Sequence, residues 1–352
     1  MANGTFALSQ PISASDEPWE DASAGDATTT MDWNLVQNFE VGVFSADGAV
    51  GIAGGIAASS SQPYAQDGSS TSRPYHRAPS SMLSQIGVGA FGIVWRVTDT
   101  TTCAVRVKKT VHTSVFDSFR AKTGSTLAYD SEYNILVELD HPNIMKAFSL
   151  EVSDGATHLF SEFIEGSTWI EHLLAHGPFL APVTVHLLMQ LLSATSHIHG
   201  HDILHRDIKP ENIMVSHGTT RALKLIDFGL AKIISAGCIT VVGTSFYVAP
   251  EVLFKSLRGP TGRYSSAADM WSVGVTMYVA WCASPPVEDG VWAPAATANA
   301  YSFMYDEAEW SHDLGANIRR CVSGMTEWAP HAREAAGQGY KQLEAVASST
   351  RV

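Results

Sequence analysis

From about residue 82 onward, apolar and polar residues alternate along the chain, as they do in strands that bury one face. Runs of this kind, rich in β-branched residues, occur at 83–97, 103–111, 144–150 and 158–164. Three glycines divide the first run, which predicts a hairpin of twisted strands. Between the second and third runs, Ile135, Leu136 and Leu139 recur at helical spacing and predict a helix over 127–139. We therefore expect five strands and one helix in a first, β-rich lobe.

After Gly166 the apolar spacing becomes helical, and a second lobe built mainly of helices is expected. Helices are predicted over 168–175, 182–199, 267–283 and 312–325. The longest of them carries Leu187, Leu188, Leu191 and Leu192 on one stripe, which is typical of a helix that packs on a core. The predicted lobes are 81–161 and 167–336, joined by a hinge at 162–166 and followed by a short C-terminal tail at 337–352. The expected fold class is α+β.

Residues 1–80 consist mainly of Ser, Ala, Gly, Thr, Asp and Pro. This composition offers little apolar surface to offset the entropy lost on ordering, so we expect a disordered, acidic, low-complexity extension. Apolar side chains gather between Trp33 and Phe44, and a short docking element there is the alternative to a wholly solvated tail.

Composition and charge narrow the function classes. With 352 residues, 45% of them apolar and 16% charged, the chain is suited to one large or two small globular domains. Its formal net charge is −13, and residues 1–72, which lack Lys and Arg, carry nine of the acidic side chains. There is no basic stripe in the sequence to neutralise phosphates, so neither nucleic acid nor a membrane is expected as a partner.

The four cysteines, Cys103, Cys238, Cys282 and Cys321, lie far apart and form no Cys-x-x-Cys pair. Neither a disulfide framework nor a zinc site is therefore indicated, and reduced thiols are expected. The first residues lack the basic and apolar regions of a secretory signal. We expect a soluble intracellular protein of the cytoplasm, with the nucleus as an alternative.

Gly87, Gly89 and Gly92 lie between two predicted strands. Glycines at this spacing let backbone N–H groups approach phosphate oxygens closely, although a plain hairpin turn needs similar residues. These three positions alone are compatible with both phosphate binding and a simple turn.

Two motifs further along the chain favour phosphate chemistry. They are His-Arg-Asp-Ile-Lys-Pro-Glu-Asn at 205–212 and, after a strand-like run, Asp-Phe-Gly at 227–229. With these motifs in this order, about residues 82–335 resemble the eukaryotic protein kinase family, serine/threonine type. The resemblance implies a bilobal protein kinase fold over 81–336, with ATP and Mg²⁺ as cofactors and a protein as the substrate.

The resemblance also implies roles for the motif residues. Asp207 would accept or orient the proton of the substrate hydroxyl, and Lys209 would balance charge on the moving phosphoryl group. Asn212 and Asp227 would hold Mg²⁺, which prefers oxygen ligands. Lys209 together with Thr244, in a Gly-Thr-Ser-Phe-Tyr sequence, implies Ser and Thr rather than Tyr as acceptors.

For the nucleotide, the resemblance implies a cleft between the lobes. Val94, Ala104 and Met214 would sandwich the adenine ring. Backbone groups of the hinge at Glu162 and Ile164 would contact the edge of the ring, and the three glycines would lie over the phosphates.

Glu132 lies on the apolar face of the first predicted helix, where a carboxylate is costly unless a cation meets it. In the family, a lysine of the third strand meets this glutamate. We align Ala104 with the family's alanine, because Val105 and Val107 then face the core together. Arg106 then stands where the lysine is usual.

Three basic residues are candidates for the position of the family's lysine. Counting from Gly92, 14 residues reach Arg106 and 17 reach Lys109, and both spacings occur in the family. Lys109 would leave the charged Lys108 facing the core, so strand alternation favours Arg106, with Lys108 on the same face as a partial substitute. Which of the three contacts Glu132 and the phosphates stays open. A nucleotide-binding pseudokinase or weakly active regulatory scaffold is therefore the alternative function.

The resemblance further implies a switch. Thr240 lies four residues before Thr244, where the family carries an activating phosphothreonine, and Arg206 is the usual partner of that phosphate. We expect phosphorylation by an upstream activating kinase to order residues 232–242, with a constitutively ordered loop as the alternative.

Three further residues match positions that build the family's scaffold. Glu251 is expected to pair with Arg333 across the second lobe. Asp269, near the start of the predicted 267–283 helix, is expected to anchor the loop that carries the catalytic motif.

Overall fold

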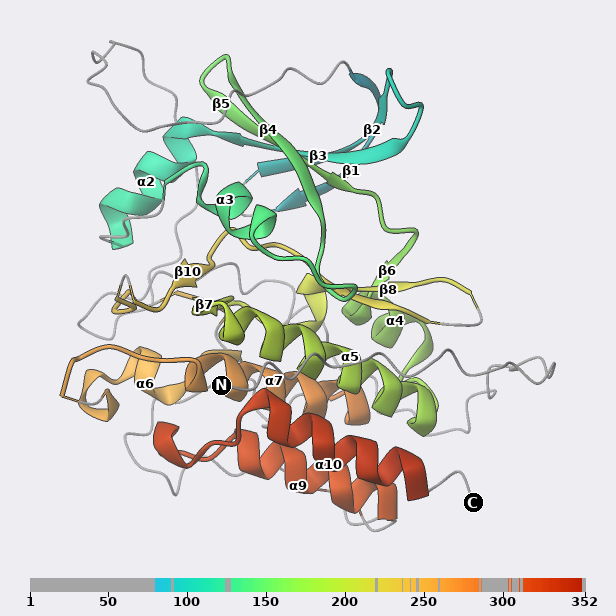
Figure 1. Ribbon diagram of the computed structural model, residues 1–352, viewed down its shortest axis with the longest axis vertical. Coiled ribbons are helices and arrows are strands. Elements are labelled where there is room, and N and C mark those ends of the chain that lie inside the picture. Colours follow the sequence, from blue (N-terminus) through green and yellow to red (C-terminus); the bar gives the residue numbers. More distant parts are fainter. Residues whose placement is uncertain are drawn as a thin grey trace, which may run out of the picture. The chain divides into compact units, whose positions relative to one another are not determined.

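The computed structural model of the protein describes residues 80–349, apart from 90–91, 124–127, 219–220, 236, 241, 245–246, 259, 285, 287–302, 304, 306–309 and 311–312. Except for Ser80, the predicted extension over 1–80 and its docking element lie outside the described residues. The described chain forms two lobes, which we call the N-lobe (80–161) and the C-lobe (167–349), joined by residues 162–166 (Figure 1).

The N-lobe is built on a sheet of five antiparallel strands in the order β1-β2-β3-β5-β4 (Figure 1). The strands are β1 (Ser80–Gly89), β2 (Gly92–Asp99), β3 (Val105–His112), β4 (Ala147–Ser153) and β5 (Ala156–Glu162). Gly92 lies where β2 approaches β3 closely, since a Cβ there would collide with the backbone of Thr110. The alternation in the sequence thus predicted this sheet, with strand ends shifted by a few residues.

Two helices of the N-lobe follow β3, namely α2 (Thr113–Thr123) and α3 (Ser131–Val137). The second corresponds to the predicted 127–139 helix and turns two apolar residues into the core. The sequence pattern does not predict α2, because most of its residues are polar. Its Phe119 is buried in a small cluster with Leu230 and Val242 of the C-lobe.

The C-lobe contains short strands on either side of the loops that carry the two sequence motifs. One sheet contains β6 (Gly166–Thr168), β8 (Ile213–Ser216) and β9 (Leu223–Leu225), and another contains β7 (Ile203–Leu204) and β10 (Lys232–Ile233). The longer helices are α4 (Trp169–His176), α5 (Ala181–Gly200), α7 (Ala267–Cys282), α9 (Asp313–Met325) and α10 (Ala336–Ser349). Short helical turns are η1 (Pro210–Asn212), α6 (Pro250–Leu253), η3 (Lys255–Leu257) and η5 (Pro330–Ala332).

The α7 helix forms the centre of the C-lobe core, because it contacts both α5 and α9. Every residue from 268 to 280 is buried. A helix that is apolar on all sides is stable only when it is covered on all sides, which explains the long apolar run in the sequence. A single carboxylate, that of Asp269, lies near the start of this buried stretch.

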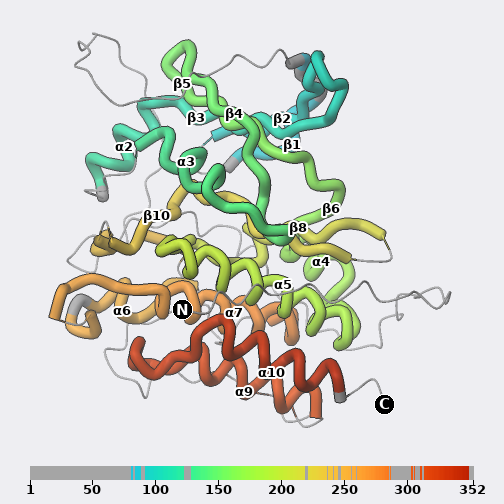
Figure 2. Tube along the Cα trace, in the orientation of Figure 1, coloured from blue at the N-terminus to red at the C-terminus, as the bar shows by residue number. Residues whose placement is uncertain are grey.

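The α10 helix begins at Ala336, where the second lobe was expected to end, and lies against α5 and α9 (Figure 2). Its Leu343 is fully buried in the main core, so residues 337–349 belong to the C-lobe rather than to a tail. The sequence obscures this helix because two glycines lie in its first turns. One of them, Gly339, lies close to the terminal methyl group of Met325, so the helix packs tightly on α9 at this point.

The expected α+β fold class, with a β-rich N-lobe and a helical C-lobe, is confirmed. None of the helices in the described part of the chain combines the length and the apolar character needed to cross a bilayer. The four cysteines all lie within the described residues, and none of them forms a disulfide bond there.

Candidate active site

The predicted catalytic residues lie together in the loop between β7 and β8. Asn212 donates two hydrogen bonds from Nδ2 to Asp207, one to the backbone oxygen and one to Oδ2, each 2.8 Å long. Lys209 Nζ lies 3.1 Å from the same Oδ2, and the two side chains are only 13% and 9% exposed. The motif residues therefore converge on one carboxylate in a place with little access for water.

Thr244 joins this cluster from the segment 227–251, which we call the activation segment. Its Oγ1 donates a hydrogen bond to Asp207 Oδ1 at 2.8 Å and accepts one from Lys209 Nζ. The Asp207 carboxylate is therefore in direct contact with an alcohol oxygen, the functional group that a Ser or Thr substrate offers.

Asp269 of α7 fixes the loop that carries Asp207. Its carboxylate accepts hydrogen bonds from the backbone N–H groups of His205, at 2.9 Å, and Arg206, at 2.8 Å. His199 Nε2 lies 3.0 Å from the same carboxylate. Burial alone would raise the pKa of Asp269, but the hydrogen bond and charge of His199 keep it below its ordinary value. The predicted anchoring role of this residue is confirmed.

Asp227 enters the site from the loop after β9, with a left-handed φ of 57°. Its Oδ1 accepts hydrogen bonds from Lys109 Nζ at 2.6 Å and from the Gly229 N–H at 3.2 Å. Burial would raise the pKa of Asp227, but the charge of Lys109 outweighs it and lowers the pKa to about 2. The following residue, Phe228, meets His205 edge to face, with ring centroids 4.7 Å apart, so the two motifs pack on each other.

Lys109 of β3 is the cation that meets Glu132 of α3. Its Nζ lies 3.1 and 2.9 Å from the two carboxylate oxygens of Glu132, in addition to the bond with Asp227. The Lys109 and Glu132 side chains are 15% and 14% exposed. Burial alone would lower the pKa of Lys109, but the two carboxylates outweigh it and raise the pKa, so the side chain stays charged.

The expectation that Arg106 takes this place is wrong. Arg106 and Lys108 lie on the other face of the sheet, because successive residues of a strand alternate between faces and Lys109 is three residues from the first and one from the second. The Arg106 guanidinium lies 3.7 Å from the ring centre of Phe148, and Lys108 Nζ lies 5.8 Å from that of Phe160. Charged groups stacked on aromatic rings are tolerated on a half-buried face, which the argument from alternation did not allow for.

The place expected for Ala104 shifts in the same way. Ala104 precedes β3 and belongs to the turn after β2, where its carbonyl accepts a hydrogen bond from the Asp99 N–H at 2.9 Å. Val107 lies two residues before Lys109 and so shares its face of the sheet. Val107 therefore replaces Ala104 as the small apolar residue beside the lysine.

The predicted glycines lie at the β1–β2 end of the sheet, near the lysine. In the pairing of these strands, Gly89 is opposite Gly92 and Gly87 is opposite Val94. Val94 is in turn directly opposite Lys109 in β3. The strand register therefore brings the glycines, Val94 and the lysine to the same part of the N-lobe.

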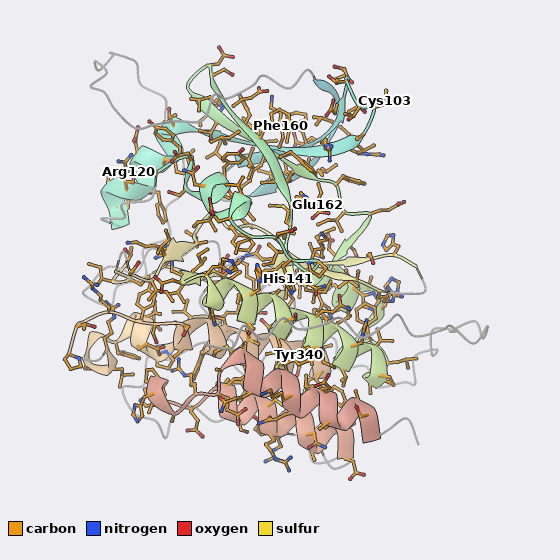
Figure 3. All side chains as sticks on the ribbon, viewed as in Figure 1. Cys103, Arg120, His141, Phe160, Glu162 and Tyr340 are labelled. Atoms are coloured by element: carbon orange, nitrogen blue, oxygen red, sulfur yellow. The ribbon has the colours of Figure 1, made fainter. Side chains whose placement is uncertain are left out.

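The remaining nucleotide candidates lie at the passage between the lobes. Glu162 ends β5, where Figure 3 marks it, and Ile164 follows in the hinge. The Glu162 carboxylate is occupied by Lys224 Nζ at 2.7 Å and by the Lys146 N–H at 2.8 Å. Both of these bonds end on Oε1, and the Glu162 N–H donates to the Lys146 carbonyl at 2.9 Å, so this residue fixes the start of the hinge. Met214 lies in β8 of the C-lobe.

The donor groups of Asn212 and Asp227 fit Mg²⁺. Both hydrogen bonds of the Asn212 amide to Asp207 use Nδ2, which leaves its oxygen as an acceptor. The protein contacts given above engage Oδ1 of Asp227, and its side chain is still 36% exposed. One carboxylate and one amide oxygen suit Mg²⁺, because this ion keeps several waters and needs few protein ligands.

Arg206 and Thr240 are brought together through a residue that the sequence analysis did not single out. Arg206 donates from Nε to the Leu230 carbonyl at 2.6 Å and from Nη1 to the Tyr264 hydroxyl at 3.1 Å. The same hydroxyl donates to the Thr240 carbonyl at 2.7 Å. Tyr264 belongs to no recognisable motif, so no local signal pointed to it.

The expected ion pair between Glu251 and Arg333 is confirmed. Arg333 donates from Nη1 and Nη2 to the two carboxylate oxygens of Glu251, at 2.6 and 2.8 Å. The guanidinium also lies 5.0 Å from the ring centre of Trp271. This pair ties the end of the activation segment to the turn before α10.

The chain is similar to one family model and to several known proteins. Residues 80–342 match the family model described as the protein kinase domain. The chain is 36% identical over 204 residues to a probable myosin light chain kinase of Dictyostelium discoideum, an alignment that covers 57% of this chain and 62% of the relative. It is 34% identical over 218 residues to the probable serine/threonine-protein kinase fhkD of the same organism, covering 59% of this chain and 29% of the relative.

A human relative, serine/threonine-protein kinase DCLK3, is 37% identical over 174 residues, which cover 49% of this chain and 26% of the relative. The chain thus spans less than two thirds of the length of these relatives. The family model, in contrast, covers most of the chain and the whole of the described site. The chain belongs to the eukaryotic protein kinase family, with relatives of the serine/threonine type.

Proposed function

We propose that the protein transfers the γ-phosphoryl group of ATP to Ser or Thr hydroxyls of a protein substrate. The observation that carries the proposal is the joint contact of Lys109 with Glu132 and Asp227. It places a charged lysine between the helix of the N-lobe and the loop that would hold the metal. The alternative of a pseudokinase or weakly active scaffold rested on an arginine at this position, and that argument no longer applies.

Phosphoryl transfer needs an oriented hydroxyl and neutralised charge rather than covalent chemistry by the protein. Asp207 orients the acceptor hydroxyl and takes its proton on a carboxylate oxygen. Lys209 balances the charge of the moving group from the other side of that hydroxyl. The contact of Thr244 with both side chains supports this, because one alcohol oxygen already fits between them.

The nucleotide would lie between the lobes. Val94 and Val107 from the N-lobe and Met214 from the C-lobe would enclose the adenine, with backbone groups of Glu162 and Ile164 at its edge. Gly87, Gly89 and Gly92 would lie over the phosphates, and Lys109 would meet them. Asn212 and Asp227 would hold Mg²⁺, which supplies positive charge to the phosphate oxygens.

The acceptor class, partners and location are parts of the same proposal. The four cysteines form no disulfide bond among the described residues, which suits a reducing compartment, so the cytoplasm or the nucleus is proposed as the location. A protein substrate is proposed as the partner, without nucleic acid or membrane. Phosphorylation of Thr240 by an upstream kinase, with Arg206 as the phosphate's partner, stays a prediction from the sequence.

The test is phosphate incorporation from labelled ATP by the purified full chain with Mg²⁺ and a mixture of peptides that contain Ser, Thr or Tyr. We expect label on Ser and Thr peptides, and a loss of at least about 100-fold in the Asp207→Asn variant. Absence of incorporation by the wild type, or equal incorporation by Asp207→Asn, would overturn the proposed activity.

A further inference from the structure

Three consecutive carbonyl groups of the activation segment are bound by two residues from the stretch between α6 and α7. The Tyr264 N–H donates to the Cys238 carbonyl at 3.0 Å, and the Tyr264 hydroxyl donates to the Thr240 carbonyl at 2.7 Å. Arg258 Nη1 donates to the Ile239 carbonyl between them, at 2.9 Å. We call this arrangement the carbonyl clamp.

The clamp has a fixed base. Arg258 also donates to the carbonyls of Glu251 and Val252, each at 2.7 Å, and its side chain is almost fully buried. Those carbonyls belong to α6, which the Glu251 carboxylate ties to Arg333. The clamp therefore joins the middle of the activation segment to its own well-anchored end.

The Tyr264 hydroxyl also connects the clamp to the catalytic loop. It accepts a hydrogen bond from Arg206, the residue directly before Asp207. Tyr264 is 3% exposed, and burial raises its pKa, so the hydroxyl keeps the proton that it donates to Thr240. Both hydrogen-bonding functions of this hydroxyl are thus in use, one toward each segment.

The clamped residues lie close to the candidate chemistry. Thr240 is four residues from Thr244, whose hydroxyl contacts Asp207 and Lys209. A shift of the Thr240 carbonyl would displace Thr244 and alter the surroundings of the Asp207 carboxylate. Since the clamp binds the backbone of Thr240, it does not depend on the side chain of that residue.

We propose that Tyr264 and Arg258 are positioning residues, which set the activation segment for catalysis without phosphorylation of Thr240. This inference rests on the proposed function and defines how the same site is regulated. The Tyr264 hydroxyl takes up Nη1 of Arg206, whereas Nη2 of the same guanidinium is buried without a hydrogen-bond partner among the described residues. The switch predicted from the sequence is the alternative, and the two make opposite predictions for a matched pair of variants.

The matched variants are Thr240→Ala and Tyr264→Phe. The first removes the phosphorylatable hydroxyl but keeps the hydrogen bond to the Thr240 carbonyl. The second removes that hydrogen bond but keeps the Thr240 hydroxyl. Initial rates are measured on the full chain at varied ATP. We expect Thr240→Ala to stay within about twofold of the wild type, and Tyr264→Phe to lose about tenfold in kcat with the KM for ATP nearly unchanged. Tyr340→Phe, on α10 (Figure 3), is the control and should match the wild type.

A second measurement does not require activity. Amide hydrogen exchange of peptides covering 232–240 should be faster in Tyr264→Phe than in the wild type and unchanged in Thr240→Ala. If the wild type transferred no phosphate, the proposed function would fail while this exchange experiment still tested the clamp. Inactivity of Thr240→Ala beside an active Tyr264→Phe, or equal exchange in all variants, would refute the clamp.

Discussion

The guanidinium of Arg333 and the carboxylate of Glu251 form two parallel hydrogen bonds of 2.6 and 2.8 Å, and neither side chain is more than 1% exposed. Removing one partner of such a pair leaves the other charge buried without compensation. We expect Arg333→Leu to lower the free energy of unfolding by about 3–5 kcal/mol. Urea unfolding followed by tryptophan fluorescence measures this change.

The control for that substitution is Arg319→Leu on α9, where the side chain is exposed and its guanidinium lies 4.3 Å from the ring centre of Tyr305. This change should cost no more than about 1 kcal/mol. The double variant Glu251→Leu with Arg333→Leu should recover part of the lost stability, because no unpaired charge remains. Equal losses for Arg333→Leu and Arg319→Leu would contradict the role given to the buried pair.

The local motifs were sufficient to predict the catalytic cluster. Asp207, Lys209 and Asn212 lie within six residues of one another, so the backbone of one loop and one helical turn brings them together. Asp227 follows β9, which the strand-like run before it predicted, and the pairing of β9 with β8 brings it to the loop that carries Asn212. The residues of the catalytic cluster are therefore either close in sequence or brought together by one pair of adjacent strands.

The position of the lysine could not be predicted in the same way. Alternation along β3 divides its residues into two faces, but which face accepts charged side chains depends on rings from other strands. Phe148 of β4 and Phe160 of β5 provide the surface on which Arg106 and Lys108 lie. Likewise, the clamp joins residues about 20 positions apart through backbone carbonyls, which carry no sequence signal.

His141 predicts a pH dependence of stability. Its Nδ1 accepts a hydrogen bond from the Asn143 N–H at 3.1 Å, so this nitrogen carries no proton in the folded state. Burial, assisted by the neighbouring His197, lowers the pKa of His141 to about 4 from 6.5. Between these values the unfolded state binds more protons, so the stability that His141 contributes is lost as the pH falls from 6.5 toward 4.

The measurement is the free energy of unfolding of the wild type and of His141→Gln from pH 7.5 to 4.5. We expect the advantage of the wild type to shrink steadily below pH 6.5. His331→Gln, at an exposed position in η5, should follow the wild type over the whole range. A constant difference between His141→Gln and the wild type would show that His141 does not titrate in this way.

Phe119 predicts a link between α2 and the activation segment. Its ring is buried with Leu230, which follows the Asp-Phe-Gly motif, and with Val242 near Thr244. We expect Phe119→Ala to cost about 2–4 kcal/mol of stability and to reduce kcat more than the KM for ATP. Phe116→Ala on the same helix is the matched control, since that ring meets Tyr129 instead.

Steady-state kinetics and thermal unfolding of both variants distinguish packing from a general loss of the helix. The kcat of Phe119→Ala should be the lower of the two at a temperature where both variants are folded. Equal kcat values would mean that α2 does not act on the activation segment.

The most direct test of the central claim compares two substitutions in β3, Lys109→Met and Arg106→Met, by the kcat/KM for ATP in phosphate transfer to a Ser or Thr peptide. Both replacements keep an apolar stem and remove one charge. We predict a loss of at least about 100-fold for Lys109→Met, because Glu132 and Asp227 lose their shared cation, and a change of less than about threefold for Arg106→Met. A larger loss in Arg106→Met than in Lys109→Met would contradict the account.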